Sequence, residues 1–212
     1  MAGTITKLSF QKRNSERVNV HLDGRYAFAL PDIEAAKLRR GQFLSDAEIT
    51  QLRALDARQR AYERVLRLLS HRPRSEVEVQ RYLKRKETPP EVIDEVLERL
   101  QREGYLDDAA FVRFWVENRE RHNPRGVWAL RQELRQKGVA GPLIESALEG
   151  LDTEDGAYRA LDRRRRRWQG MAYADYRRLA GSYLTRRGFD YAVARDALEK
   201  MWAEIAPEDV RE

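Results

Sequence analysis

Three segments of the chain align with one another almost without gaps. They lie at residues 79–100, 130–151 and 180–201. Their register is fixed by three leucines at spacings of 51 and 50 residues, Leu83, Leu134 and Leu184. Such repeats build extended surfaces, because each unit buries its apolar face only against its neighbours. The repetition predicts a stack of similar helical units, and it favours a protein that binds a large partner over an enzyme.

Prolines and glycines mark the same boundaries in successive repeats. Pro73 and Pro124 are 51 residues apart and separate the first helix of a repeat from its second. Gly138 and Gly188 end the second helices, where glycine adopts the left-handed conformation at little cost. Each repeat is therefore expected to be a three-helix module. In the first one Glu87 stands in place of the glycine, which leaves the geometry of that turn open.

The first part of the chain has a different pattern. Apolar and polar residues alternate along residues 18–22 and again along residues 26–30, which is typical of strands. Asp23 and Gly24 form a hairpin signal between these runs, and Pro31 ends the second run. A small antiparallel β meander is predicted here.

Two helices are expected to link the meander to the repeats. The first runs from Asp32 to Arg40, with Gly41 as its left-handed cap. The second begins at a capping box of Ser45 and Glu48 and continues into the first repeat. The predicted fold is mainly α, an elongated tandem array of three three-helix repeats preceded by the meander and the linking helices. The predicted divisions are 1–44 (β-rich extension with short helix), 45–103 (linking helix and repeat 1), 104–151 (repeat 2), 152–205 (repeat 3) and 206–212 (frayed tail).

Charge and composition limit the classes of function. The 212 residues include 41 Lys and Arg and 35 Asp and Glu, a formal charge of +6, so an acidic partner would need a local basic patch. Cysteine is absent, which excludes disulfides, thiolate metal sites and cysteine nucleophiles and favours the cytoplasm. No apolar run reaches the roughly 20 residues that span a bilayer, and the opening residues lack the zones of a signal peptide. Neither membrane insertion nor secretion is expected.

No catalytic, metal or cofactor site is predicted. The histidines, His21, His71 and His122, have no partner at metal-ligand or triad spacing and are interpreted as surface or cap residues. Asp107 and Asp108 precede an apolar helix, so helix capping explains them better than acid–base chemistry. The glycines are dispersed, and none forms a phosphate-binding loop.

Basic residues recur towards the ends of the second helices. They are Arg81, Lys84, Arg85 and Lys86 in the first repeat, Arg131, Arg135 and Lys137 in the second, and Arg186 and Arg187 in the third. Equivalent helix ends of the same charge would form a stripe suited to a phosphate backbone or an acidic protein surface. Alternatively, these charges complement the helix macrodipoles, at some 0.3–1 kcal/mol each. The spacing does not separate the two interpretations.

Two further groups have structural explanations that compete with binding. Residues 163–167 are five successive arginines that would cover every side of a helix, and Asp155 and Asp162 are close enough to neutralise part of the run.

The four tryptophans are suited to stacking on unpaired bases, but packing between modules is preferred because apolar neighbours surround them. They are Trp115, Trp128, Trp168 and Trp202.

A motif in the central repeat identifies a related family. It consists of Gly104-Tyr105-Leu106-Asp107-Asp108, Phe111, Trp115, Arg119, Gly126, Glu133-Leu134 and Lys137-Gly138-Val139. With this motif the chain resembles the RecX family of recombinase regulators, from about Ala61 to the end of the third repeat. The β-rich opening resembles an extension of longer family members.

The resemblance implies a bacterial cytoplasmic protein without catalytic activity or cofactor. Its implied partner is RecA: it would lie in the groove of the RecA–DNA filament and modulate, mainly inhibit, recombinase, ATPase and coprotease activities in DNA repair, homologous recombination and the SOS response. By position, the residues implied to be structural are Gly104, Tyr105, Leu106, Gly126, Leu134 and Gly138. The residues predicted to contact RecA or DNA are Lys84, Arg85, Lys86, Arg119, Arg125, Arg131, Arg135, Lys137, Arg186 and Arg187.

Two other functions fit the same residues. One is a RecA-independent basic helical module that binds single- or double-stranded DNA, with an affinity that falls steeply as salt rises. The other is a helical scaffold for a different protein. The chain is expected to be a monomer without membrane contact.

Overall fold

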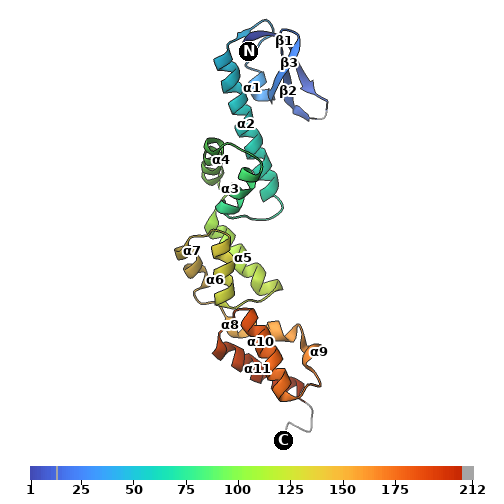
Figure 1. The fold of residues 1–212 in the computed structure, drawn as a ribbon, viewed down its shortest axis with the longest axis vertical. Coiled ribbons are helices and arrows are strands. Elements are labelled where there is room, and N and C mark those ends of the chain that lie inside the picture. The colour runs from blue at the N-terminus through green and yellow to red at the C-terminus, as the bar shows by residue number, and fades with distance from the viewer. Residues whose placement is uncertain (13, 207–212) are drawn as a thin grey trace. The chain divides into compact units, whose positions relative to one another are not determined.

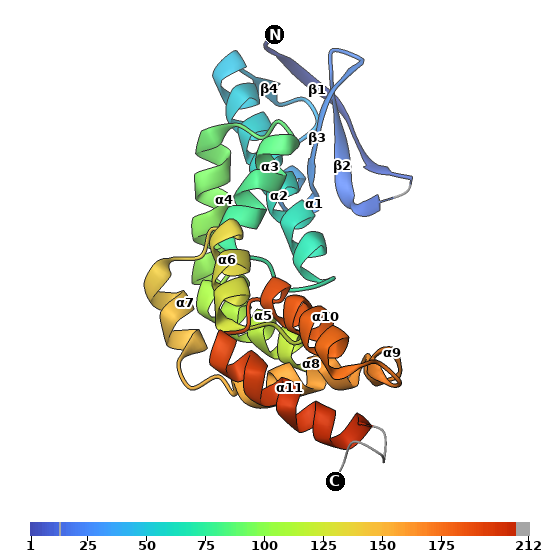
Figure 2. The same ribbon diagram turned by 60° about the horizontal axis from the view of Figure 1, so that its bottom comes forward.

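The computed structural model describes residues 1–12 and 14–206, a small N-terminal sheet followed by helices (Figures 1 and 2). The chain divides into two units, which we call unit 1 (Met1–Arg72 with Val79–Tyr105) and unit 2 (Pro73–Glu78 with the residues from Leu106 onward). Most of the predicted tail, residues 207–212, lies outside the described part, whereas Ala206 is buried.

The sheet in unit 1 has four antiparallel strands in the order β3-β2-β1-β4. The predicted meander is confirmed by β1 (Gly3–Gln11), β2 (Asn14–Leu22) and β3 (Arg25–Pro31). Asp23 and Gly24 take positive φ angles of 47° and 83° in the hairpin between β2 and β3. The strand β4 (Phe43–Leu44) pairs with β1, and sequence patterns did not predict it because two residues are too few to show a period.

Two helices follow the sheet. Helix α1 (Asp32–Ala35) ends earlier than predicted. Gly41 lies in a turn with φ of 86°, and its backbone N–H donates a hydrogen bond to the Ile5 carbonyl. This glycine therefore returns the chain to the sheet instead of capping a helix. Helix α2 (Asp46–Leu69) begins at the predicted capping box, and its Asp56 accepts a 2.6 Å hydrogen bond from Arg17 of β2.

The remaining helices confirm the three-helix repeats. Module 1 comprises the end of α2 with α3 (Glu76–Arg85) and α4 (Pro90–Arg102). Module 2 comprises α5 (Asp108–His122), α6 (Val127–Gln136) and α7 (Gly141–Leu148). Module 3 comprises α8 (Thr153–Asp162), α10 (Tyr173–Arg186) and α11 (Tyr191–Ile205), with a short additional helix α9 (Arg165–Trp168). The leucines that fix the repeat register are fully buried, Leu83, Leu134 and Leu184.

The second helix of every module ends in the same left-handed turn. Gly138 and Gly188 have φ angles of 81° and 78°, and Glu87 takes 56° at the equivalent position. In each turn the N–H of the following residue donates to the carbonyl of the register leucine. These bonds join Thr88 to Leu83 at 3.2 Å, Val139 to Leu134 at 3.2 Å and Phe189 to Leu184 at 3.3 Å. The turn at Glu87, whose geometry the sequence did not decide, thus has the same geometry as the turns at the two glycines.

Hydrogen bonds at these turns join neighbouring parts of unit 2. The Lys137 carbonyl accepts a 2.6 Å bond from the Ser75 hydroxyl, and the Arg187 carbonyl accepts a 3.0 Å bond from the Gly126 N–H. Ser75 and Gly126 are 51 residues apart and occupy equivalent positions in the repeat register. We call these two contacts the joints. Equivalent positions are therefore joined twice, once through a side-chain donor and once through a backbone donor.

In each joint, the glycine that follows the accepting carbonyl lies against the start of the second helix of the preceding module. A Cβ on Gly138 would lie 2.5 Å from the side chain of Val77, and one on Gly188 would lie 2.5 Å from the Cβ of Ala129. Glycine is thus needed for its positive φ and for this close approach. Glu87 is exposed, and no module precedes module 1, so its position requires only the φ angle. This difference explains why a residue with a side chain is accepted there.

The last module departs from the pattern at the position equivalent to Ser75 and Gly126. Tyr176 occupies it, inside helix α10, fully buried. Its hydroxyl donates a 3.0 Å hydrogen bond to the Leu198 carbonyl. Module 3 therefore uses this position for its own core.

Replacing Glu87 by Gly is expected to stabilise the protein. A residue with a Cβ loses roughly 1–2 kcal/mol in the left-handed conformation, and the extra freedom of an unfolded glycine offsets part of the gain. We expect the free energy of unfolding in urea to rise by about 1 kcal/mol. The comparison variant is Gly104→Ala, at φ of 75° with open space around its Cβ, which should lower stability. A decrease for Glu87→Gly would contradict the prediction.

Candidate macromolecular interface

Five of the predicted contact residues are exposed on helix ends. Lys84, Arg85 and Lys86 lie at the end of α3 in unit 1, and Arg135 and Arg186 lie at the ends of α6 and α10 in unit 2. Arg186 bonds to the Ser182 hydroxyl, and across residues 1–12 and 14–206 none of the five forms an ion pair. We call these five residues the open basic set. The continuous stripe predicted from them stays a prediction.

Two further candidates belong to the joints. The ammonium group of Lys137 lies 2.6 Å from a Glu78 carboxylate oxygen and 4.8 Å from the centre of the Trp115 ring. The guanidinium of Arg187 donates to the Asn123 side-chain oxygen at 2.7 Å. Lys86, the equivalent residue of module 1, is exposed because no joint forms there. Lys137 and Arg187 thus have a structural role that sequence reasoning missed.

The last three candidates are paired within module 2. Glu133 lies 2.8 Å from Arg119 and 3.7 Å from Arg125. Arg131 makes two 2.7 Å hydrogen bonds to Glu145, and these bonds hold the pKa of Glu145 below its usual value. A partner would have to compete with these carboxylates for the three arginines.

The predicted helix caps include a contact between modules. Asp107 accepts hydrogen bonds from the N–H groups of Ala109 and Ala110 and caps α5, as predicted. Asp108 accepts instead from the Glu76 N–H at 2.8 Å, at the start of α3. Burial raises the pKa of Asp108. Asp107 therefore caps α5, and Asp108 binds the start of α3, next to the joint between Ser75 and Lys137.

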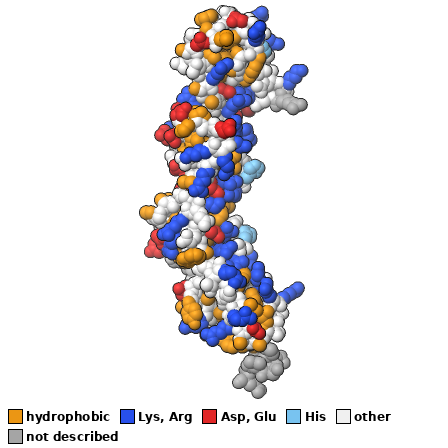
Figure 3. Space-filling view, in the orientation of Figure 1, with side chains coloured by type: hydrophobic (Ala, Val, Ile, Leu, Met, Phe, Trp, Pro, Cys, Tyr) orange, Lys and Arg blue, Asp and Glu red, His pale blue; other side chains and the backbone are white. Residues whose placement is uncertain are grey.

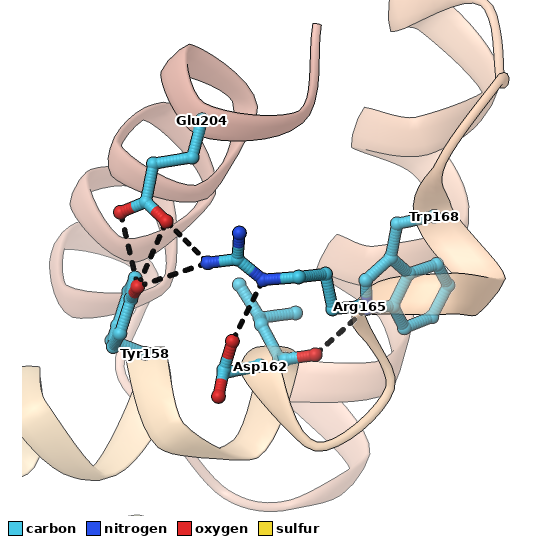
Figure 4. Close-up of polar contacts among 6 residues, drawn as sticks. Tyr158, Asp162, Arg165, Trp168 and Glu204 are labelled. Carbon is cyan, nitrogen blue, oxygen red and sulfur yellow. Dashed lines mark hydrogen bonds and ion pairs between the residues drawn. The ribbon is translucent and has the colours of Figure 1, made fainter.

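The arginine run is not one continuous helix. Helix α8 ends at Asp162 and α9 begins at Arg165, so the expectation that five helical positions cover every side is wrong. Figure 4 shows Arg165 held by Asp162 at 2.8 Å and by Glu204 of α11, whose carboxylate also accepts from Tyr158. Asp162 thus pairs with the run as predicted, whereas Asp155 pairs with Arg159. Arg165 joins three helices and is occupied within the chain.

The tryptophans have different environments. Trp168 is 2% exposed, and its indole N–H donates to the Leu161 carbonyl at 3.1 Å (Figure 4). Trp115 and Trp202 are half-buried. Trp128 is 62% exposed, contrary to the packing preferred from sequence, and lines a cavity of about 600 Å³ with Phe189. Its neighbours in the sequence are apolar, but the face of α6 that carries it is not covered.

Neither a metal-binding group nor a membrane-spanning helix occurs among the described residues. The part of the chain that the structure describes contains no group of three or more His, Cys, Asp or Glu side chains arranged to hold a metal ion. Within the same part, no helix combines the length and the apolar character required to cross a bilayer. Lys and Arg side chains are distributed over the face seen in Figure 3, with Asp and Glu between them.

The N-terminal sheet and the tandem three-helix modules define the class, a modular helical-repeat protein. Family models match three parts of the chain: the regulatory protein RecX N-terminal domain at residues 3–44, the first RecX three-helix domain at 61–100 and the second at 107–148. The regulatory protein RecX of Bacillus subtilis strain 168 is 34% identical over 202 residues, 93% of this chain and 76% of that protein. The chain belongs to the RecX family.

Other relatives agree with this assignment. The regulatory protein RecX of Listeria monocytogenes serovar 1/2a is 30% identical over 152 residues, 71% of this chain and 56% of that protein. A crystal structure of regulatory protein RecX superimposes with a TM-score of 0.71 at 27% identity, covering 93% of this chain and 99% of the other. A crystal structure of RecX from Lactobacillus salivarius, at 19% identity and a TM-score of 0.60 over 69% of this chain and 97% of the other, shares the fold.

Proposed function

We propose that this chain regulates the RecA recombinase, without catalysis of its own, by binding the RecA–DNA filament in the bacterial cytoplasm and mainly inhibiting strand exchange, ATP hydrolysis and coprotease function. Membership in a family of regulatory proteins, shown by the matches to its N-terminal and three-helix domains, is the observation that carries the proposal.

The open basic set supports this proposal. Its members form no ion pair in the described part of the chain, although the charge of Arg135 acts on the nearby Glu145 carboxylate, so their charge is available to DNA phosphates or to acidic side chains of RecA. In the repeat register Lys84 of module 1 corresponds to Arg135 of module 2, and Arg85 of module 1 corresponds to Arg186 of module 3, with Gln136 at that position in module 2. Arg131 and Lys137 contribute less, since Glu145 and Glu78 hold them.

The proposal is tested by adding the purified protein to RecA on single-stranded DNA with ATP. Hydrolysis should slow and filaments should shorten, and reversal of charge in Arg135→Glu should weaken both effects. Arg113→Glu is the matched control, because Arg113 is exposed on α5 and has no ion pair in the described part of module 2. Unchanged hydrolysis and filament length at saturating wild-type protein would contradict the proposal, and equal loss in both variants would contradict the assignment of Arg135.

A further inference from the structure

Arginines of module 3 converge on the end of helix α5 in module 2. The Arg163 guanidinium donates to the backbone carbonyls of Arg121, at 2.6 Å, and His122. The Arg187 guanidinium donates to the Pro124 carbonyl at 2.9 Å. Two positive side chains, one following α8 and one following α10, thus meet at the end of α5 and the loop after it within unit 2.

A tyrosine ring brings a third arginine to the same place. Arg164 and Arg187 each place the guanidinium carbon 4.7 Å from the centre of the Tyr183 ring. Arg125 follows Pro124 on the loop, and its positive charge acts on Arg187 together with that of Arg164. We call these four residues the arginine cluster: Arg125, Arg163, Arg164 and Arg187.

Little negative charge offsets the arginine cluster. The carboxylate nearest to Arg125, that of Glu133 at 3.7 Å, already accepts a 2.8 Å bond from Arg119. Among residues 1–12 and 14–206, Arg163, Arg164 and Arg187 have no carboxylate partner. The carbonyl end of α5 contributes only about half a negative charge. Four positive charges therefore face one shared carboxylate and the end of one helix.

This excess charge lies in partly buried surroundings. Burial lowers the pKa of Arg187, and the nearby charges of Arg125 and Arg164 lower it further. The Arg125 Nε is buried and has no hydrogen-bond partner in the described part of the chain, because its ion-pair partner, Glu133 Oε1, is 3.7 Å away and so beyond hydrogen-bond distance. Both features are unfavourable in the protein alone, since buried charges and donors require partners. A bound anion would supply the missing negative charge and acceptor.

A shallow cavity adjoins the arginine cluster. It has a volume of about 610 Å³ and is lined by residues 162–167. Its only acidic lining residue, Asp162, is bonded to Arg165 (Figure 4). In Figure 3, several Lys and Arg side chains lie together over the region of α8 to α10. The cavity therefore gives an anion room beside the cluster.

We propose that the arginine cluster and the adjoining cavity bind the phosphate backbone of single-stranded nucleic acid. Guanidinium groups match phosphate oxygens with two parallel hydrogen bonds, and a strand offers a phosphate at every nucleotide to neighbouring arginines. Tyr183 is buried beneath two guanidinium groups, so it offers no free face for a base. The site recognises backbone charge and is independent of base sequence.

Binding of a fluorescent oligothymidylate, measured by anisotropy over a range of KCl concentrations without RecA, tests the site. Arg164→Gln should weaken binding several-fold and lower the slope of log affinity against log salt by about 0.7, the value for one phosphate contact on a single strand. Arg164→Lys, which keeps the charge, should retain the slope. Arg177→Gln is the matched control: Arg177 is exposed on α10 and makes no hydrogen bond or ion pair in the described chain.

Equal weakening by Arg164→Gln and Arg177→Gln would show diffuse charge attraction and overturn the site. Absence of binding by the wild-type protein at low salt would overturn it as well. Tighter binding of labelled polyglutamate than of oligothymidylate, dependent on Arg164, would assign the cluster to an acidic protein. Circular dichroism and melting curves confirm that the variants are folded. Because no recombinase is present, this result is independent of the proposed regulation of RecA.

Discussion

Replacing Gly126 by Ala should lower the free energy of unfolding by about 3 kcal/mol or more, at the upper end of overpacking effects. The new Cβ would lie 2.0 Å from the Gly188 carbonyl oxygen and 2.4 Å from the Phe189 nitrogen. Both are backbone atoms of module 3, so they can move away only if the joint opens and the bond from the Gly126 N–H to the Arg187 carbonyl is lost. A fall in melting temperature on the order of 10 °C is expected in calorimetry.

Gly141→Ala is the control for this prediction. Gly141 is the first residue of α7, and nothing lies within 4 Å of the position of an added Cβ. Alanine favours the helical conformation over glycine, so this variant should be unchanged or slightly stabilised. If Gly126→Ala melted at the same temperature as Gly141→Ala, the close approach in the second joint would be refuted.

Trp168→Ala is expected to lower the free energy of unfolding by about 3–5 kcal/mol, as is usual for a buried aromatic side chain. Its ring centre lies 6.3 Å from that of Tyr176 and 5.9 Å from that of Tyr183, in the core of module 3. The substitution leaves a cavity between these rings and removes the donor to the Leu161 carbonyl. Urea unfolding followed by far-ultraviolet circular dichroism measures the loss.

Trp128→Ala removes the same side chain from an exposed position. Trp128 is 62% exposed on α6, so the free energy of unfolding should change by no more than about 0.5 kcal/mol. The difference between the two tryptophans tests whether burial decides the effect. Equal losses for Trp128→Ala and Trp168→Ala would mean that the two environments are wrongly assigned.

The modular part of the fold could be predicted because its signals repeat. The register leucines mark the cores, and Gly138 and Gly188 mark the turns. The early end of α1, strand β4 and the break between α8 and α9 were missed. These short elements depend on contacts distant in the sequence, such as the bond from the Gly41 N–H to the Ile5 carbonyl, and local propensity does not reveal them.

The candidate interface was harder to predict for a related reason. Lys86 and Lys137 are equivalent in sequence, but only Lys137 has an acidic partner in a joint. Whether such a residue is exposed depends on the presence of a preceding module, which residue type does not show. The arginine run was predicted to be one continuous helix. The sequence therefore did not predict that Arg163 and Arg164 would lie with Arg187 near the end of α5.

The two ends of the repeat differ from its interior, and this limits self-assembly. A contact that joins one module to the next in a fixed direction would, if left available at both ends, let copies of the chain add head to tail into open-ended fibres. Glu87 places a side chain where the joints require a glycine, and Tyr176 fills the position from which Ser75 and Gly126 make their bonds. A second copy of the chain therefore cannot add to the described modules through the contact that the joints use.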